Sequence, residues 1–288
     1  MNDVMRKGIV FAVFFLLLLM MAVLYGCTDR KAASADSAAS DTLVNDTSSL
    51  DSTETLIAET PVPKAADELF DDFVFNFAAN RKLQMRRIQF PLPVYHNGKL
   101  TKHVDKEQWK MEHFFMHQGY YTIVFDNNKQ KYLMKDTTVG HVVVEKIFFK
   151  RKTVQQFVFD RLQGEWMLTS MNYKPLYQNK NASCLRFYHH FAVDSAFQVK
   201  SMADEVEFTA PDPEDDFSQI SGVIMPEQWP DFKPTLIPRG IIYNIIYGQH
   251  YTETTRKIFL IRGIANGLEI ELVFRKVKGK WKLVKFNS

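Results

Sequence analysis

Two histidines four positions apart are the first residues in this 288-residue chain whose types and spacing suggest chemistry. On a helix, His113 and His117 would share one face, and this spacing can hold a metal ion. A zinc protease would need its general base at position 114, which is Phe, and the sequence specifies no third ligand. The consecutive residues His189 and His190 would diverge by about 100° on a helix, so they do not form a joint site either. We predict that the protein has no metal site.

Other catalytic patterns are also missing from the sequence. No phosphate-binding glycine loop, dinucleotide-binding motif or nucleophile elbow occurs, so we predict no cofactor. The acidic stretch 212–216 lacks the spacing and the glycine of a calcium-binding loop. Cys184 would share a helical face with Tyr188 and Phe191, which predicts a buried and inert thiol. The sequence favours a protein that is not an enzyme, without deciding the question.

The N-terminus has the pattern of an export signal. Arg6 and Lys7 precede an uninterrupted apolar run, Ile9–Leu24. A helix of this length spans about 24 Å, which is short for a hydrocarbon core of about 30 Å and typical of a signal peptide. The next residues, Leu24-Tyr25-Gly26-Cys27, resemble the lipobox of bacterial lipoprotein precursors. The resemblance implies cleavage before Cys27 and attachment of lipid to its thiol, so that residues 1–26 form the signal peptide.

The resemblance also implies a location. Thr28 stands where some bacteria place an Asp to retain lipoproteins in the inner membrane. We therefore expect a protein of the cell envelope that is anchored to a membrane through Cys27. The outer membrane is favoured, with the protein facing the periplasm, and surface exposure stays open. Residues 27–62 contain seven acidic, two basic and no aromatic residues, which predicts a disordered tether.

Residues 63–288 repeat five strings in the same order. Residues 73–93 align with 191–211 at a spacing of 118, and Gly119–Phe125 aligns with Gly240–Ile246 at 121. Glu-Gln-Trp, Lys-Ile-Phe and the ending Gly-x-Trp-x-Leu also recur, at spacings of 120, 111 and 115. Repeats in register argue for duplication, with small drifts in spacing absorbed by loops.

The first copy predicts an α+β unit. Asp67–Ala79 carries an apolar stripe at helical spacing, and Ile88–Tyr95, interrupted by two prolines, is at best an edge strand. Asp105 and Gln108 resemble a capping box that opens a second helix ending at Gly119. Strands are predicted at 120–126, 130–135, 142–150, 154–162 and 166–173. Glycine-containing hairpin turns are predicted at Gln163-Gly164 and Lys278-Gly279.

This order of elements, with its terminal Phe-x4-Gly-x-Trp-x-Leu hairpin, resembles the cystatin-like roll, also called the nuclear-transport-factor-two-like fold. The resemblance implies two rolls in tandem, 63–177 and 178–288, each a curved antiparallel sheet with helices on one face. The lipobox, tether and paired rolls together resemble an uncharacterised family of Gram-negative lipoproteins with a domain of unknown function. Such rolls can enclose a cavity. The polar residues that we expect to project into it are Asp72, Tyr121, His141 and Asp160.

The second copy departs from the first in a proline-rich stretch, 211–239, which we expect to be a long loop instead of a helix. Its candidate binding residues are Glu227, Trp229 and Phe232. The alternative is a packing segment in which the two aromatic side chains are buried.

The sequence thus supports two functions. The leading hypothesis is a lipid-anchored ligand-binding or protein-interaction module whose partner is an envelope protein or a hydrophobic ligand. The alternative is a carrier or enzyme that uses an apolar cavity inside one roll. Residues 63–288 hold 32 basic and 25 acidic residues, a net charge of +7, which is too small to indicate nucleic acid.

Overall fold

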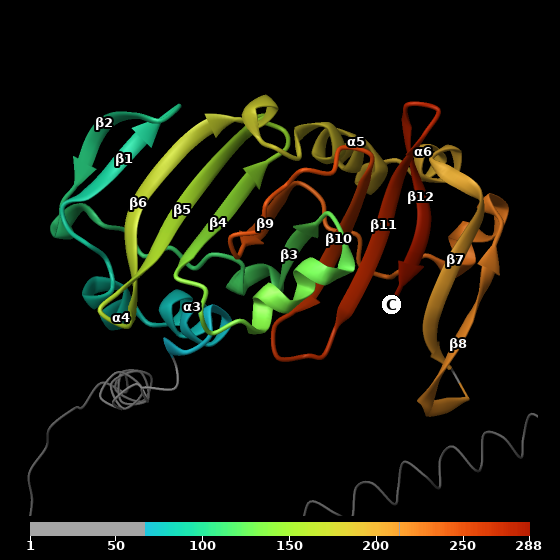
Figure 1. Cartoon of the computed structure of the whole chain (residues 1–288), viewed down its shortest axis with the longest axis horizontal. Coiled ribbons are helices and arrows are strands. Elements are labelled where there is room, and N and C mark those ends of the chain that lie inside the picture. The colour runs from blue at the N-terminus through green and yellow to red at the C-terminus, as the bar shows by residue number, and fades with distance from the viewer. Residues whose placement is uncertain (1–66, 213) are drawn as a thin grey trace, which may run out of the picture. The chain divides into compact units, whose positions relative to one another are not determined.

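The computed structural model describes residues 67–212 and 214–288 (Figure 1). The predicted signal peptide, Cys27, the predicted tether and residues 63–66 lie outside these ranges. Within them, no helix has both the length and the apolar character needed to cross a membrane.

A single curved sheet of twelve strands dominates the described residues, in the order β2-β1-β6-β5-β4-β9-β3-β10-β11-β12-β7-β8. Most neighbours are antiparallel, while β1 with β6, β7 with β12 and β3 with β9 are parallel. The strands are β1 (Leu92–His96), β2 (Lys99–Val104), β3 (Tyr120–Phe125), β4 (His141–Phe148), β5 (Thr153–Leu162), β6 (Glu165–Pro175), β7 (Met202–Asp212), β8 (Asp215–Ile224), β9 (Ile241–Ile246), β10 (Arg256–Gly263), β11 (Glu269–Val277) and β12 (Lys280–Asn287).

Few helices accompany the sheet, and two hydrophobic cores result. One core contains the buried stripe of α3 and the other contains that of α5, while alternate residues of the central strands β3 and β10 enter one core or the other. The α-helices are α3 (Phe70–Ala79), α4 (Arg81–Arg86), α5 (Ala182–Val193), α6 (Ser195–Lys200) and α7 (Trp229–Phe232). The 3-10 helices are η2 (Lys106–Gln108), η3 (Met116–Gln118), η4 (Asn128–Lys135), η5 (Leu176–Gln178) and η6 (Pro226–Gln228).

Matching contacts recur in the two halves of the sheet. The side chain of Asn80 accepts a hydrogen bond from Leu83 N–H at 3.0 Å and begins α4, and Asp194 does the same for Phe197 N–H at 2.9 Å in α6. These caps are 114 positions apart, so the spacing of 118 that the sequence suggested for this region is wrong by four residues, about one helical turn. The mistake left the apolar stripe in phase because residues i and i+4 share a helical face.

The strands of the two halves are interleaved at the centre of the sheet. β9 pairs with β4, and β3 pairs with β10, so each of these strands pairs with the sequence half to which it does not belong. The side chain of Asn244 joins them: it accepts a hydrogen bond from Val124 N–H at 3.0 Å and donates one to Glu145 at 3.2 Å. The described residues therefore form one continuous sheet that crosses the predicted boundary at residues 177 and 178.

Several local predictions are confirmed. The helix predicted at 67–79 is α3, and the strands predicted at 120–126, 142–150, 154–162 and 166–173 are β3 to β6 within a few residues. Both predicted hairpin turns have two consecutive residues with positive φ: 52° and 87° at Gln163-Gly164, and 50° and 78° at Lys278-Gly279. Such turns match the twist of the paired strands.

The predicted second helix is wrong. Only η2 and η3 form between Asp105 and Gly119, although the capping box of Asp105 is present. Phe114 has a φ of 48°, which an α-helix does not allow, and Phe114 and Phe115 both enter the core. The core thus takes two successive aromatic side chains at the cost of a regular helix.

Two strand predictions and one loop prediction also need correction. Residues 128–135 form the 3-10 helix η4 instead of a strand, and β1 is an inner strand because β2 covers its edge. The stretch 211–239 is not one long loop, since its first part belongs to the hairpin of β7 and β8. Pro211 lies in β7 and is paired there with Gln219. Proline is uncommon inside strands, and Pro211 is tolerated where the register of β7 and β8 shifts between Pro211 and Asp212, so the sequence pattern favoured a loop.

Candidate functional site

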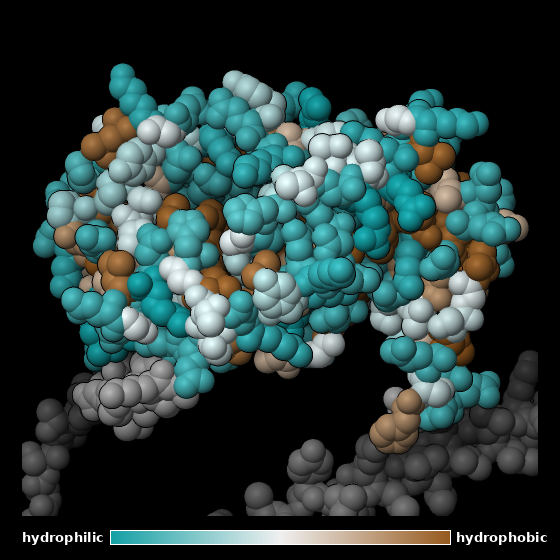
Figure 2. Space-filling view, in the orientation of Figure 1, coloured by the Kyte–Doolittle hydropathy of each residue, from teal (hydrophilic) through white to brown (hydrophobic). Residues whose placement is uncertain are grey.

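A groove of about 450 Å³ opens at the ends of three inner strands, where β4 and β6 finish and β5 begins. Figure 2 shows hydrophobic surface between hydrophilic residues over the middle of β4, β5 and β6. The lining is mixed, with aromatic rings, amides, a hydroxyl and cations. The residues are His96, Asn97, Phe148, Arg151, Thr153, Gln155, Tyr173, Lys174 and Pro175.

Aromatic rings and a cation build the walls of the groove. The ring of His96 stacks on that of Tyr173 with centroids 4.9 Å apart and planes 19° from parallel. On the opposite wall, the Arg151 guanidinium lies 5.3 Å from the ring centroid of Phe148. Gln155 and Thr153 come from β5 between these walls. Planar apolar surfaces and hydrogen-bonding groups therefore converge on one concave space.

An ion pair lies near the groove on the side of the sheet that α3 covers. Lys146 Nζ is 3.1 Å from both carboxylate oxygens of Glu112, and it faces the rings of Phe148 and Tyr243 at 5.8 and 5.3 Å. The Tyr243 hydroxyl donates to Glu112 Oε1 at 3.3 Å. Burial, and then the charge of Glu112, raise the pKa values of Tyr243 and Tyr173, so both phenols are neutral donors at ordinary pH.

The loop that carries Glu112 is held by one buried side chain. Gln84 is fully buried and donates to the carbonyl oxygens of Phe77 and Glu112 at 2.8 and 2.7 Å. Its Oε1 accepts from Trp109 Nε1 at 3.0 Å and from Glu112 N–H at 3.3 Å. Since these bonds fix the backbone on both sides of the loop, Glu112 is positioned for Lys146 before any ligand arrives.

We call the hydrogen bonds of Gln84 to the Phe77 carbonyl and to Trp109 a clamp. The second half repeats this clamp without the ion pair. Gln198 donates to Phe191 O at 2.7 Å and accepts from Trp229 Nε1 at 2.9 Å. The position three residues after the clamped tryptophan is Glu112 in the first half and Phe232 in the second. The Lys-Ile-Phe strings are not equivalent in the sheet, because the pairing of β4 with β5 and of β10 with β11 matches Phe148 to Gly263 and Phe259 to Val144. The spacing of 111 suggested by the sequence is therefore wrong by four residues.

A second polar cluster surrounds Asp71 at the start of α3. Tyr121 donates to its Oδ2 at 3.1 Å, Tyr247 donates to Oδ1, and Arg262 Nη1 lies 3.3 Å from Oδ2. Burial raises the pKa of Asp71, although the two hydroxyls and Arg262 oppose that shift. Burial and the Asp71 charge also raise the pKa of Tyr121. The cluster joins the first helix to strands of both halves.

The predicted cavity residues do not form one site. Tyr121 is buried, but its partner is Asp71, whereas Asp72 is exposed on the outer side of α3. His141 and Asp160 do meet, with Nδ1 and Oδ1 2.7 Å apart, on the exposed surface of β4 and β5. The phase of the α3 stripe could have selected Asp71, because it lies three residues before the buried Val74 and Asp72 does not share that face.

The predicted binding residues of the second copy also separate. Trp229 is 1% exposed and belongs to the core, as the alternative of a packing segment requires. Phe232 is 38% exposed and packs beside Phe208, and Glu227 is exposed. Trp229 therefore offers no surface to a partner, because its ring is enclosed and its N–H is already bonded to Gln198.

The remaining candidates have no site around them in the described ranges. Cys184 is 2% exposed, and burial raises the pKa of its thiol to about 12, so the prediction of a buried, unreactive thiol is confirmed. The rings of His113 and His117 lie 4.8 Å apart, although they do not share a helix: His117 lies in the 3-10 helix η3 and His113 precedes it. No group of three or more His, Cys, Asp or Glu side chains suited to a metal occurs among the described residues. Glu112, Lys146 and the groove were missed, since only tertiary contacts bring them together.

A large curved sheet, few helices and a groove on one face of the sheet define an α+β protein of the NTF2-like class. An NTF2-like protein from Bacteroides fragilis NCTC 9343, known from a crystal structure at 2.15 Å resolution, is 38% identical to this chain. The match has a TM-score of 0.72 and covers 79% of this chain and 98% of the other. The family model described as "Domain of unknown function (DUF4348)" matches residues 49–288, so this chain belongs to that family. No curated protein matches the chain.

Proposed function

We propose that the protein is an envelope lipoprotein that binds a small ligand in the groove between Tyr173 and Phe148. The observation that carries this proposal is the lining of the groove. Stacked aromatic rings, amides and the Arg151 guanidinium converge there on one concave space. The NTF2-like fold often forms ligand-binding cavities, which agrees with this assignment.

The proposal includes two parts that rest on the sequence. The first is the duplication of a cystatin-like roll, supported by the repeated helix caps and by the repeated Gln84–Trp109 and Gln198–Trp229 clamps. The second is the anchor at Cys27 and a position on the outer membrane that faces the periplasm. Metabolic labelling with palmitate tests the anchor: wild type should incorporate label, and Cys27→Ala should not. Label retained in the variant would exclude lipidation at this residue.

The groove is tested by filling it. Thr153 lies in its floor, so Thr153→Trp should occupy the space without changing any charge. The probe is 8-anilinonaphthalene-1-sulfonate, a planar anion whose fluorescence rises on binding. Full-length wild type in detergent should bind it saturably and the variant should not, while the control Gln219→Trp, on exposed strand β8, should bind as wild type does. Equal binding by all three proteins would exclude the groove.

A second candidate function is favoured by the Asp71 cluster. A carboxyl group with a raised pKa and two phenolic donors is the equipment of a general acid or base, which fits an enzyme that uses a cavity in the roll. The two functions separate on one variant: Asp71→Asn would abolish turnover of any substrate but leave binding in the groove intact.

A further inference from the structure

Three segments around the groove carry basic residues and no acidic ones. Residues 93–104, 146–159 and 173–193 together contain nine Lys and Arg and no Asp or Glu. The chain as a whole holds nearly equal numbers, 36 and 33. The imbalance is therefore local to these segments.

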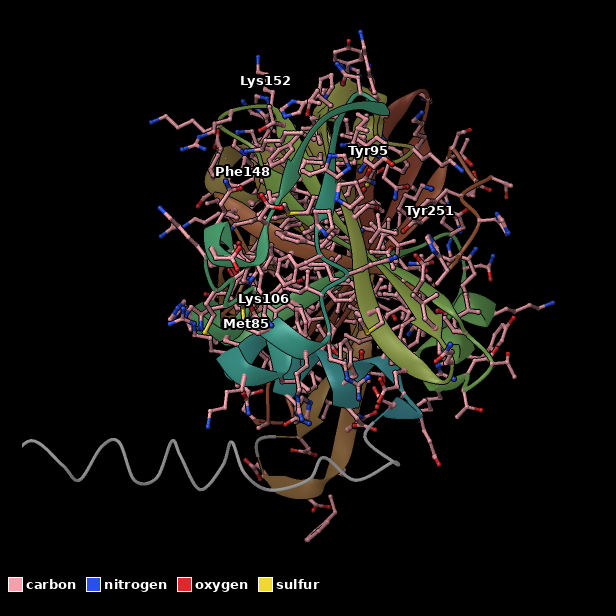
Figure 3. The ribbon with its side chains drawn as sticks, turned by 90° about the vertical axis from the view of Figure 1, so that its left-hand side faces the viewer. Met85, Tyr95, Lys106, Phe148, Lys152 and Tyr251 are labelled. Atoms are coloured by element: carbon pink, nitrogen blue, oxygen red, sulfur yellow. The ribbon has the colours of Figure 1, made fainter. Side chains whose placement is uncertain are left out.

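The structure brings the three segments together at one end of the strands β1, β4, β5 and β6. His96 is paired with Tyr173, and Phe148 with Thr153, which is itself paired with Pro175. Leu176 N–H donates to Lys152 O at 2.8 Å. Figure 3 shows Lys152 and Phe148 toward one end of the strands and Met85 and Lys106 toward the other. We call this region the basic end; five of its exposed cations are Lys99, Lys150, Arg151, Lys152 and Lys180.

The cations of the basic end are free to meet a ligand. Lys146 is paired with Glu112, and Lys174 lies 3.8 Å from Glu145. None of the five exposed cations has a carboxylate within 4.0 Å among residues 67–212 and 214–288. Unpaired like charges repel one another, and an anionic ligand relieves that repulsion.

The second half shows that the fold does not impose this charge. The turn between β4 and β5 contains Lys150, Arg151 and Lys152, whereas the matching turn between β10 and β11, residues 264–268, contains no charged residue. The turn between β1 and β2 ends at Lys99, whereas the matching turn between β7 and β8 is acidic, with Asp212 and Glu214. A groove over the second half is lined by Glu205 and Glu207 as well as by cations, so a lining with cations and no carboxylate is particular to the groove of the first half.

From the groove and the basic end together we infer that the ligand is an anionic saccharide, a sugar that carries carboxylate, sulfate or phosphate groups. The inference rests on the proposed function. Aromatic faces such as those of Tyr173 and Phe148 pack against the C–H faces of sugar rings, and amides such as Gln155 and Asn97 bond to hydroxyl groups. Arg151 at the rim supplies the planar donor pair that recognises an anionic group.

The shape and lining of the site argue for a sugar over other anions. A bilayer surface is met by protruding apolar side chains, while these rings line a concave space. A purely hydrophobic ligand would leave His96, Asn97, Thr153 and Gln155 without partners on binding, which costs free energy. The sugar satisfies both the rings and the polar groups.

The test uses full-length protein in detergent and heparin oligosaccharides as the probe, measured by titration calorimetry at low salt. Wild type should bind them, and added salt should weaken the binding. Arg151→Glu should reduce the affinity about tenfold or more, because a charge-assisted contact becomes a repulsion. The control is Lys280→Glu, which reverses an exposed charge at the start of β12 and should bind as wild type does. Thr153→Trp should abolish binding.

Each outcome bears on one proposal. Equal losses of affinity in Arg151→Glu and Lys280→Glu would show that binding depends only on the net charge of the protein, and would overturn the inference. Tighter binding to vesicles containing phosphatidylglycerol, or to single-stranded DNA, would overturn it in favour of those anions. If the fluorescent probe binds in the groove and is lost in Thr153→Trp, but heparin oligosaccharides do not bind, the saccharide inference fails and the proposed function stands. If no binding responds to Thr153→Trp, the proposed function itself fails.

Discussion

Each half of the sheet contains a lysine–carboxylate pair, and the two pairs differ in burial. Lys257 in β10 is 4% exposed and paired with the equally buried Asp126 at 2.5 Å. Lys146 in β4 and Glu112 are each about one-fifth exposed near the groove. The two lysines share the Lys-Ile-Phe string but not a place in the sheet, because Lys146 is paired with Gln155 of β5 and Lys257 with Phe274 of β11. Asp126 also accepts hydrogen bonds from Thr252 and Glu253 N–H, which makes the second pair part of the framework.

The comparison shows where two similar halves of one sheet can differ. Contacts that satisfy buried backbone groups recur in both halves, because losing them leaves polar atoms without partners in the core. The helix caps and the Gln84 and Gln198 clamps are of this kind. Residues around the ends of the strands do not satisfy buried backbone groups, and there the first half has a groove with a basic rim, whereas a groove over the second half has carboxylates in its lining.

The largest predicted effect separates the two lysines. Lys257→Met leaves Asp126 buried and unpaired and should reduce the free energy of unfolding by about 3–5 kcal/mol. Lys146→Met should cost about 1 kcal/mol or less, since water reaches both partners. Urea denaturation of both variants measures the difference. Similar losses in the two would show that the pairs have equivalent structural roles.

The next prediction compares the clamps. Gln84→Leu removes four hydrogen bonds and leaves backbone groups of Phe77 and Glu112 without partners, so it should reduce the free energy of unfolding by about 3 kcal/mol. Gln198→Leu removes the two bonds found in the second half and should cost about 2 kcal/mol. Only Gln84→Leu should also weaken ligand binding, because only that clamp positions Glu112. A binding defect of the same size in Gln198→Leu would contradict this division.

The smallest predicted effect is a pH dependence of stability from Asp71. Burial raises the pKa of this carboxyl above the value of 3.8 expected in an unfolded chain. Between pH 3.8 and the higher pKa of the folded state, Asp71 binds more protons in the folded protein than in the unfolded chain. The contribution of Asp71 to stability is therefore greatest at low pH and falls as the pH rises through the folded pKa, by up to about 1.4 kcal/mol per pH unit.

Denaturant unfolding of wild type and Asp71→Asn between pH 4 and 8 measures this contribution. The variant should lack it, while the exposed neighbour in Asp72→Asn should keep the wild-type profile. The same slope in wild type and Asp71→Asn would assign the pH dependence to another group. The second half has Leu185 at the position matching Asp71, so no equivalent term is expected from it.

Elements with a strong local signal could be predicted from the sequence. The helical spacing of Phe70, Phe73, Val74 and Phe77 predicts α3, and the glycines predict the two hairpin turns. The segment between Asp105 and Gly119 could not, because its capping box begins a helix that the core then stops at Phe114. Trp229 was ambiguous in the same way, since an aromatic residue in a proline-rich stretch reads equally as a ligand contact or as a core side chain.

The α+β character, the repeated order of elements and the buried Cys184 follow from local patterns in the sequence. Periodicity, turn residues and composition are local properties, and each constrains its own segment. Three other features depend on long-range packing: β3 and β9 pair with strands of the other half, Asp71 and not Asp72 meets Tyr121, and Glu112 faces Lys146. These contacts join residues far apart in the chain, and they form because a single sheet buries more apolar surface and leaves fewer strand edges unpaired than two separate ones would.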